Sequence, residues 1–230
     1  MALFAIGDPH LSFQADKPMD VFGEVWKDHP QKLRRGFLDH VSADDTVVLC
    51  GDLSWGMRLE DCEEDFRFLN DLPGRTKLIV KGNHDYWWTT GNKMETFFRA
   101  HGLDTFRLLH NNCLLYGETA LCGTRGWFYE LEQAGHNEKM LNRECMRLEA
   151  SLRAAGEREK IAFLHYPPVY QGYRCEPILK LLNQYGVKRC YYAHLHGASR
   201  KLAIEGMCGG IEYSLISADH LNFVPKKILD

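Results

Sequence analysis

Aspartate and histidine residues two positions apart draw attention first in this sequence, because both members of such a pair can bind one metal ion. Asp8 and His10 form one pair, and His194 and His196 form another. On a strand they would share a face, and in the loop leaving a strand both can turn toward one ion. With the amide oxygen of Asn83 they make a nitrogen and oxygen ligand set that suits manganese, iron, zinc or similar ions. The pattern predicts a metal site that is not a structural zinc finger.

Short apolar segments precede these polar residues and are typical of buried strands. The expected strands are Leu3–Ile6, Thr46–Cys50, Lys77–Val80, Ile161–Leu164 and Cys190–Tyr192. Polar clusters follow all five, with Asp8, Asp52, Asn83, His165 and His194 in that order. In layered α/β proteins, ligands bind beyond the carboxyl ends of the strands. We therefore expect the five loops to converge on one site.

The segments between these strands show helical patterns. Helices are expected over Val21–Val41, Leu59–Leu72, Asn92–His101, Glu138–Ala155 and Glu176–Tyr185. Further strands are expected in Cys113–Cys122, broken at Gly117-Glu118, and in Ile211–Val224, broken at Asp219-His220. The sequence shows no repeat and no linker, so we expect one domain over residues 1–230.

Five short motifs occur in order along the chain: Asp8-Pro9-His10, Gly51-Asp52, Gly82-Asn83-His84-Asp85, His165 and Ala193-His194-Leu195-His196. In order and spacing this series resembles the motifs of the calcineurin-like metallophosphoesterases, over nearly the whole chain. One departure is Ala193, where members of that family usually have glycine. The resemblance implies an α/β fold in which two central mixed β-sheets form a sandwich flanked by helices.

The same resemblance implies a binuclear metal centre. It assigns Asp8, His10 and His196 to the first ion, Asn83, His165 and His194 to the second, and Asp52 to a bridge between them. His84 would be a catalytic residue and not a ligand. The implied cofactors are two divalent ions, with manganese preferred and iron or zinc as alternatives. The formal charges of two such ions, two ligand carboxylates and one hydroxide sum to about +1. A site with this net charge attracts a phosphate anion.

Three features, in or near the motifs, each have two interpretations. Arg125 follows a strand-like segment, where its guanidinium could bind a substrate phosphate, but it could equally be an ordinary surface arginine. Asp85 is expected either to cap a turn or to orient the imidazole of His84. The aromatic run from Tyr86 to Trp88 favours packing against the core over a pocket for a base.

Charge and composition limit the partners. The formal net charge is −3, so the chain lacks the basic stripe that long nucleic acid requires. We expect a small phosphoester or a phosphorylated protein segment as the partner, with no long nucleic acid. No segment approaches a membrane span, the start has no basic leader, and the eight cysteines form no CxxC pair. These features favour a cytoplasmic protein with reduced cysteines and no membrane partner.

The sequence therefore predicts a metal-dependent hydrolase of phosphomonoesters or phosphodiesters, in which a metal-bridging hydroxide attacks phosphorus in line. One alternative is a catalytically inactive scaffold of the same fold, and another is a nuclease. The complete set of metal ligands argues against the inactive scaffold. The excess of acidic over basic residues argues against the nuclease. Fold and motifs leave the substrate and the oligomeric state open, because substrate choice lies in the loops over the site.

Overall fold

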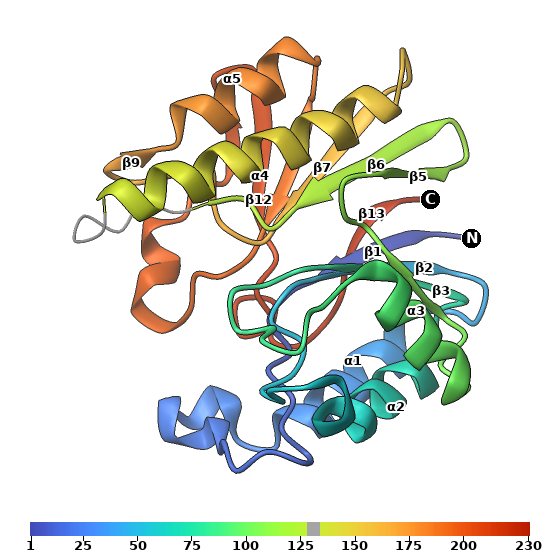
Figure 1. The fold of residues 1–230 in the computed structure, drawn as a ribbon. Coiled ribbons are helices and arrows are strands. Elements are labelled where there is room, and N and C mark those ends of the chain that lie inside the picture. Colours follow the sequence, from blue (N-terminus) through green and yellow to red (C-terminus); the bar gives the residue numbers. More distant parts are fainter. Residues whose placement is uncertain (128–133) are drawn as a thin grey trace. The chain divides into compact units, whose positions relative to one another are not determined.

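The computed structural model describes residues 1–127 and 134–230 and divides the chain into two compact units (Figure 1). Unit 1 consists of Met1–Leu108 together with Ile216–Asp230, and unit 2 consists of Leu109–Leu215. Each unit is built on one large mixed β-sheet with helices beside it.

The sheet of unit 1 has the strand order β13-β1-β2-β3-β4. Its strands are β1 (Leu3–Ile6), β2 (Thr46–Cys50), β3 (Thr76–Val80), β4 (Phe106–Leu108) and β13 (Lys226–Leu229). Strands β1 to β4 are parallel, and β13 runs antiparallel to β1 at the edge. The apolar segments expected to form the first three strands are confirmed. Because these three are parallel neighbours, their carboxyl ends lie at one edge of the sheet.

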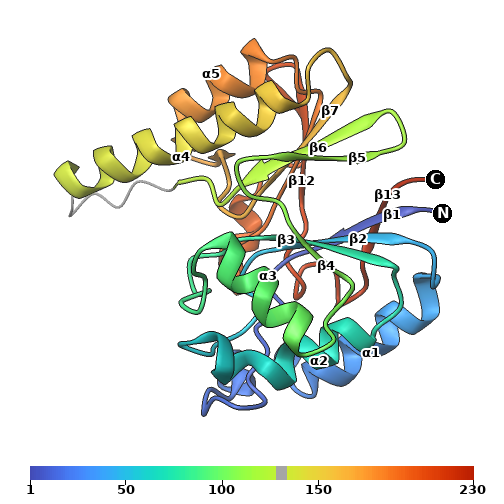
Figure 2. The ribbon, with the colours of Figure 1, turned by 45° about the vertical axis from the view of Figure 1, so that its right-hand side comes forward.

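Three helices pack on one face of this sheet, as Figure 2 shows: α1 (His29–His40), α2 (Glu63–Asp71) and α3 (Gly91–Ala100). Alternate strand residues such as Phe4 and Ile6 join Phe37 of α1 and Phe66 of α2 in one apolar core, as the two-residue period of a strand requires. The expected helix over Val21–Val41 is shorter, because α1 begins only at His29, next to Pro30.

The sheet of unit 2 has the strand order β11-β12-β10-β7-β6-β5. Its strands are β5 (Cys113–Tyr116), β6 (Thr119–Thr124), β7 (Lys160–Leu164), β10 (Arg189–Tyr192), β11 (Gly206–Cys208) and β12 (Ile211–Leu215). The four inner strands are parallel and the two edge strands antiparallel. A small hairpin joins β8 (Val169–Tyr170) to β9 (Tyr173–Arg174). The hairpin β5–β6 turns at Gly117, whose φ of 55° suits glycine.

Two helices, α4 (Ala134–Ala154) and α5 (Glu176–Gln184), lie on one face of the unit 2 sheet. Leu148 of α4 and Ile178 of α5 pack in one core with Ala162 of β7 and Tyr192 of β10. The helices expected over Glu138–Ala155 and Glu176–Tyr185 are therefore present, and the first begins four residues earlier than expected.

Of the strands expected in Ile211–Val224, on either side of a break at Asp219-His220, only the first forms. Strand β12 ends at Leu215, and the chain then enters unit 1. The backbone N–H groups of His220 and Leu221 both donate to the carbonyl of Ser217, and Phe223 adopts a φ of 61°. A turn therefore lies at the expected break and extends over the second expected strand, and the next strand, β13, begins only at Lys226.

The predicted α/β fold with two mixed sheets flanked by helices is confirmed. The assignment of one metallophosphoesterase domain to residues 1–230 stays a prediction. Among the described helices, none combines the length and the apolar character needed to cross a membrane.

Candidate metal centre

The predicted ligands of unit 1 lie in the loops that follow β1, β2 and β3. The first two loops stay paired beyond their strands, because Asp8 N–H donates to the carbonyl of Gly51 at 2.9 Å and His10 N–H donates to that of Asp52 at 3.0 Å. This backbone pairing brings Asp8 and His10 beside Asp52.

The side chain of Asp52 lies between two of these loops. Its Oδ2 is 3.7 Å from Nε2 of His10, and its Oδ1 accepts the backbone N–H of His84 at 2.8 Å. Asp8, His10 and Asp52 are all buried. A carboxylate with one oxygen toward each loop suits the bridging role that the family resemblance assigns to Asp52.

The electrostatics of this cluster fit a cation. Burial raises the pKa of Asp52 well above its usual range, and the negative charges of Asp85 and Asp8 raise it further. Buried carboxylates that lie close together are costly unless an opposite charge compensates them. Divalent ions would remove that cost, and the carboxylate, imidazole and amide donors present are ligands that such ions accept. The residues therefore fit the metal ions implied by the sequence.

Left-handed backbone conformations concentrate at the predicted ligands. Asp8, His10 and Asp52 have φ values of 57°, 46° and 52°, and His194 in unit 2 has 74°. Such conformations cost a residue other than glycine on the order of 1 kcal/mol or more, and they cluster at functional sites. The chain thus accepts strain at the positions that the motif pattern singles out.

Asp85 has the first of the two roles considered for it, that of a turn cap. Its carboxylate accepts the backbone N–H groups of Asp52 at 3.0 Å, Leu53 at 2.8 Å and Gly82 at 2.6 Å. The indole N–H of Trp87 donates to it at 3.1 Å. Burial raises the pKa of Asp85 to about 6. These bonds hold the Asp52 loop against the loop that carries Asn83 and His84.

The side chain of His84 is half-buried and contacts aromatic side chains. Its ring centroid lies 4.5 Å from that of Trp55, and Nδ1 lies 3.3 Å from the hydroxyl of Tyr86. Trp55 also stacks on His10 at 5.0 Å. Of the aromatic run, Trp87 packs in the core as expected, whereas Tyr86 is exposed and contacts His84. The sequence gives no local signal for Trp55, which lies outside the motifs.

His29 is a second residue that the motif pattern does not reveal. Its Nε2 lies 3.3 Å from the carbonyl of His10, and its Nδ1 lies 3.2 Å from that of Trp26. Burial lowers the pKa of His29. In the neutral tautomer that carries its proton on Nε2, the imidazole at the start of α1 can donate to the carbonyl of His10, whose backbone is strained.

In unit 2, the predicted ligands follow two adjacent parallel strands. His165 comes after β7 and His194 after β10, and their ring centroids lie 5.2 Å apart. Ala193 N–H donates to the carbonyl of His165 at 3.1 Å. Ala193, the departure from the family pattern, is not among the residues with positive φ, so its methyl group adds no backbone strain.

His196 begins a short 3₁₀ helix over Gly197–Leu202. Its backbone N–H donates to Oγ of Ser199 at 2.9 Å, and Ser199 N–H donates to the His196 carbonyl at 2.9 Å. These reciprocal bonds fix the loop that follows His194.

Arg125 is not the ordinary surface arginine considered above, because its side chain is only 12% exposed. Its guanidinium forms an ion pair with the buried Glu144 at 3.3 Å and lies 4.9 Å from the ring of Trp127. Thr124 and Arg147 also bond to Glu144, at 2.7 and 2.6 Å. This network holds the arginine at the end of β6, and its binding of a substrate phosphate stays a prediction.

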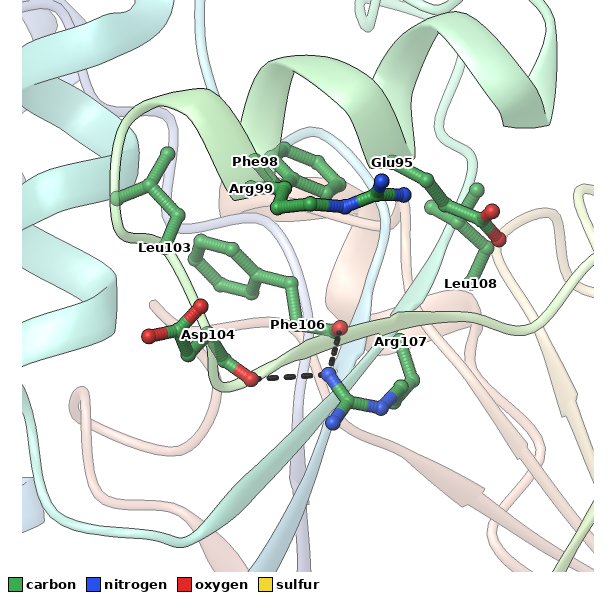
Figure 3. Close-up of a pocket in the computed structure, with 8 residues that line it drawn as sticks. All are labelled: Glu95, Phe98, Arg99, Leu103, Asp104, Phe106, Arg107 and Leu108. Atoms are coloured by element: carbon green, nitrogen blue, oxygen red, sulfur yellow. Dashed lines mark hydrogen bonds between the residues drawn. The ribbon is translucent and has the colours of Figure 1, made fainter.

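One pocket of unit 1, of about 310 Å³, lies between α3 and β4 and involves none of the predicted site residues (Figure 3). Phe98, Leu103 and Phe106 form its apolar wall. The guanidinium of Arg107 donates to the backbone carbonyls of Asp104 and Phe106, at 2.9 and 2.6 Å. We assign this pocket no role.

Comparison with known proteins places the chain in a family. Residues 1–198 match the calcineurin-like phosphoesterases, and the chain belongs to that family. Its members are generally metal-dependent hydrolases of phosphoesters and typically bind two divalent ions. No curated protein matches the sequence.

Solved structures with the same fold are distant in sequence. AQ665 from Aquifex aeolicus, a protein of unknown function, is 14% identical with a TM-score of 0.53, and the match covers 98% of this chain and 95% of that one. TT1561 from Thermus thermophilus is 14% identical with a TM-score of 0.53, covering 99% and 97%. A purple acid phosphatase from yellow lupin seeds is 13% identical with a TM-score of 0.50, covering 100% and 45%. At these identities the likeness shows the fold alone.

Proposed function

We propose that this chain is a metal-dependent phosphoesterase that acts on small phosphoesters or on a phosphorylated protein segment. The observation that carries the proposal is the buried cluster of Asp8, His10 and Asp52, held by left-handed backbone turns. Family membership supports the proposal, because the family generally hydrolyses phosphoesters. The free thiols of the eight cysteines also favour a reducing, cytoplasmic location.

We assign the metal ligands as the family pattern does. Asp8, His10 and His196 would hold one ion, Asn83, His165 and His194 would hold the other, and Asp52 would contribute to both, with manganese as the preferred metal. When bound, two such ions would lower the pKa of a bound water. Their positive charge would also stabilise the phosphoryl oxygens.

The chain's own contribution to proton transfer comes from His84. Because Nδ1 of His84 faces the Tyr86 hydroxyl, we assign Nε2 to the oxygen of the departing group. A proton donated there would stabilise an alkoxide that leaves poorly by itself. Arg125, in the network around Glu144, is the proposed contact for a phosphate oxygen.

Metal stoichiometry tests the ligand assignment. We expect two ions per chain by elemental analysis after loading with Mn²⁺. Asp52→Asn should weaken the binding of both ions, whereas His10→Ala should weaken mainly one, because only Asp52 is assigned to both. Full activity at one ion per chain under excess Mn²⁺ would contradict the binuclear assignment. Loss of the same single ion in both variants would contradict the bridge.

Leaving-group dependence tests His84. His84→Ala should keep both ions but lose roughly 10²- to 10⁴-fold in kcat/KM on alkyl esters, the usual contribution of a general acid. The loss on p-nitrophenyl esters should be much smaller, because that phenolate departs without a proton. Tyr86→Phe, which keeps the ring and removes the hydroxyl beside Nδ1, is the matched control for the surrounding contacts. Equal losses on all esters would instead indicate that His84 stabilises phosphoryl oxygens.

The same assays test the alternative of an inactive scaffold. A chain that binds two ions but hydrolyses no member of a panel of monoesters, diesters, nucleotides and phosphopeptides would have that role.

A further inference from the structure

A hollow of about 510 Å³ in unit 1 is bordered by His84. Its wall also includes Trp55 and Tyr86, two aromatic residues that contact the His84 side chain. The volume lies within the range of about 300 to 1,000 Å³ that is usual for small-molecule sites. The hollow is therefore large enough for part of a substrate and is adjacent to the proposed proton donor.

Apolar side chains are unusually exposed around this hollow. Phe22 is 60% exposed, Met57 62% and Tyr86 54%, and all three line it. Single exposed apolar residues are ordinary, but several gathered at one hollow leave apolar surface in contact with water that a ligand could cover. The grouping thus indicates a binding surface and not a consequence of packing.

The chemistry of the wall favours a ring as the occupant. Phe22, Trp55 and Tyr86 offer ring faces and edges, and Met57 offers a thioether that packs well against aromatic groups. The ammonium of Lys17 already lies 4.9 Å from the ring of Trp55, so one side of the hollow carries a cation that a π system would also attract. A flexible aliphatic chain has no π system, so it would make none of these aromatic or cation–π interactions.

We propose that this hollow binds an aromatic ring carried by the departing group of the phosphoester. The inference rests on the proposed function, because it places the ring beside the imidazole that protonates the departing oxygen. It goes further by naming the substrate class: a small ester whose alcohol or phenol bears an aromatic ring.

Two substrates with matched chemistry test the proposal. Phenyl phosphate and 2-naphthyl phosphate release phenols of similar acidity, so their rates differ mainly through the size of the ring. The metal-loaded chain should prefer the naphthyl ester in kcat/KM. Phe22→Ala and Met57→Ala, both at exposed positions, should each reduce that preference, by roughly tenfold for the loss of a large apolar contact.

Met207→Ala is the matched control. Met207 is 71% exposed but lies on β11 of unit 2 and is not among the residues that line the hollow. The control should keep the wild-type ratio between the two substrates. Metal content and circular dichroism of each variant show whether the centre and the fold are intact.

Binding of 2-naphthol, measured by fluorescence titration without any turnover, separates failure of the inference from failure of the proposed function. If the metal-loaded chain hydrolyses neither ester and no member of the panel above but binds 2-naphthol, and Met57→Ala weakens that binding, the enzymatic function is wrong and the aromatic site stands. If both esters are hydrolysed but Phe22→Ala and Met57→Ala keep the wild-type ratio and the wild-type affinity for 2-naphthol, the function stands and the inference is overturned.

Discussion

The backbone at Gly82 passes so close to Asp52 that any side chain there would overlap both the Asp52 carboxylate and its backbone amide. The glycine of this motif is therefore required by close approach, because its φ does not lie in the left-handed region. Its absence of a side chain lets the loop after β3 reach the Asp52 carboxylate.

Gly82→Ala is expected to destabilise the metal-free protein by about 1 to 3 kcal/mol, as overpacking does, and to weaken Mn²⁺ binding by displacing Asp52. Gly91→Ala is the matched control, since a methyl group there would meet only Leu108, at 3.7 Å. The control should change stability by less than about 1 kcal/mol. Urea unfolding and metal titration measure both effects. Wild-type stability and metal affinity in Gly82→Ala would contradict this interpretation.

The sequence identifies the residues whose chemistry is distinctive but not those that support them. Asp8, Asp52 and His165 can be predicted because their types recur after apolar strands in an ordered series. Trp55 and His29 cannot, because their contacts with His84 and His10 depend on how loops far apart in the sequence pack. The bonds from backbone amides to Asp85 are likewise set by the tertiary arrangement.

At the scale of elements, Asp65 connects α2 to two of the loops that carry predicted ligands. Its carboxylate accepts the backbone N–H of Phe13 at 2.9 Å and the hydroxyl of Ser54. Phe13 follows the Asp8-His10 loop, and Ser54 follows Asp52. Burial raises the pKa of Asp65 to about 6. One buried carboxyl group thus holds helix and loops together.

This raised pKa predicts a pH dependence of stability. Between about pH 4 and pH 6, the folded protein binds more protons at Asp65 than the unfolded chain does, so the free energy of unfolding falls as pH rises. The expected loss is on the order of 3 kcal/mol at most. Asp65→Asn should abolish this pH-dependent loss. The free energy of unfolding of the wild type minus that of Asp65→Asn, measured by urea unfolding without metal, should therefore fall from pH 4 to pH 6.

Asp61→Asn provides a control that should show no such fall between pH 4 and pH 6. The hydrogen bond from Arg58 lowers the pKa of Asp61, so its stabilising effect is lost only as pH falls below about 4. A difference between wild type and Asp65→Asn that stays constant from pH 4 to pH 6 would contradict the role given to Asp65.

Strands were easier to predict than the ends of helices. Continuous apolar segments such as Thr46–Cys50 mark buried parallel strands with correct bounds, because both faces of the strand are covered. The segment before α1 has helical periodicity but contains Gly23, with a φ of 122°, so it forms two short 3₁₀ turns instead. The turn after Leu215 depends on its pairing with Gly7, whose N–H donates to the carbonyl of Ile216. No local pattern could reveal that contact.

At the scale of the whole molecule, the predicted ligands are shared between the units. Asp8, His10, Asp52 and Asn83 belong to unit 1, whereas His165, His194 and His196 belong to unit 2. Neither unit alone carries the full set, so tests of metal binding require the entire chain. The net charge is also a property of the entire chain, and it affects which substrates the protein can bind.

The net charge of −3, from 28 basic and 31 acidic residues, predicts that small esters are better substrates than long nucleic acid. A protein that holds a nucleic acid backbone neutralises many phosphates and loses roughly 10³- to 10⁵-fold in affinity between 50 and 200 mM salt. A small ester presents one or two charges to the proposed ions, so its kcat/KM should change far less over that range.

The measurement compares aryl phosphomonoesters, aryl phosphodiesters and single-stranded DNA at equal Mn²⁺ loading and increasing KCl. We expect slow cleavage of DNA at every salt concentration, because the chain lacks the excess of basic residues needed to retain it. Cleavage of DNA that exceeded hydrolysis of every small ester and fell steeply with salt would instead identify the protein as a nuclease.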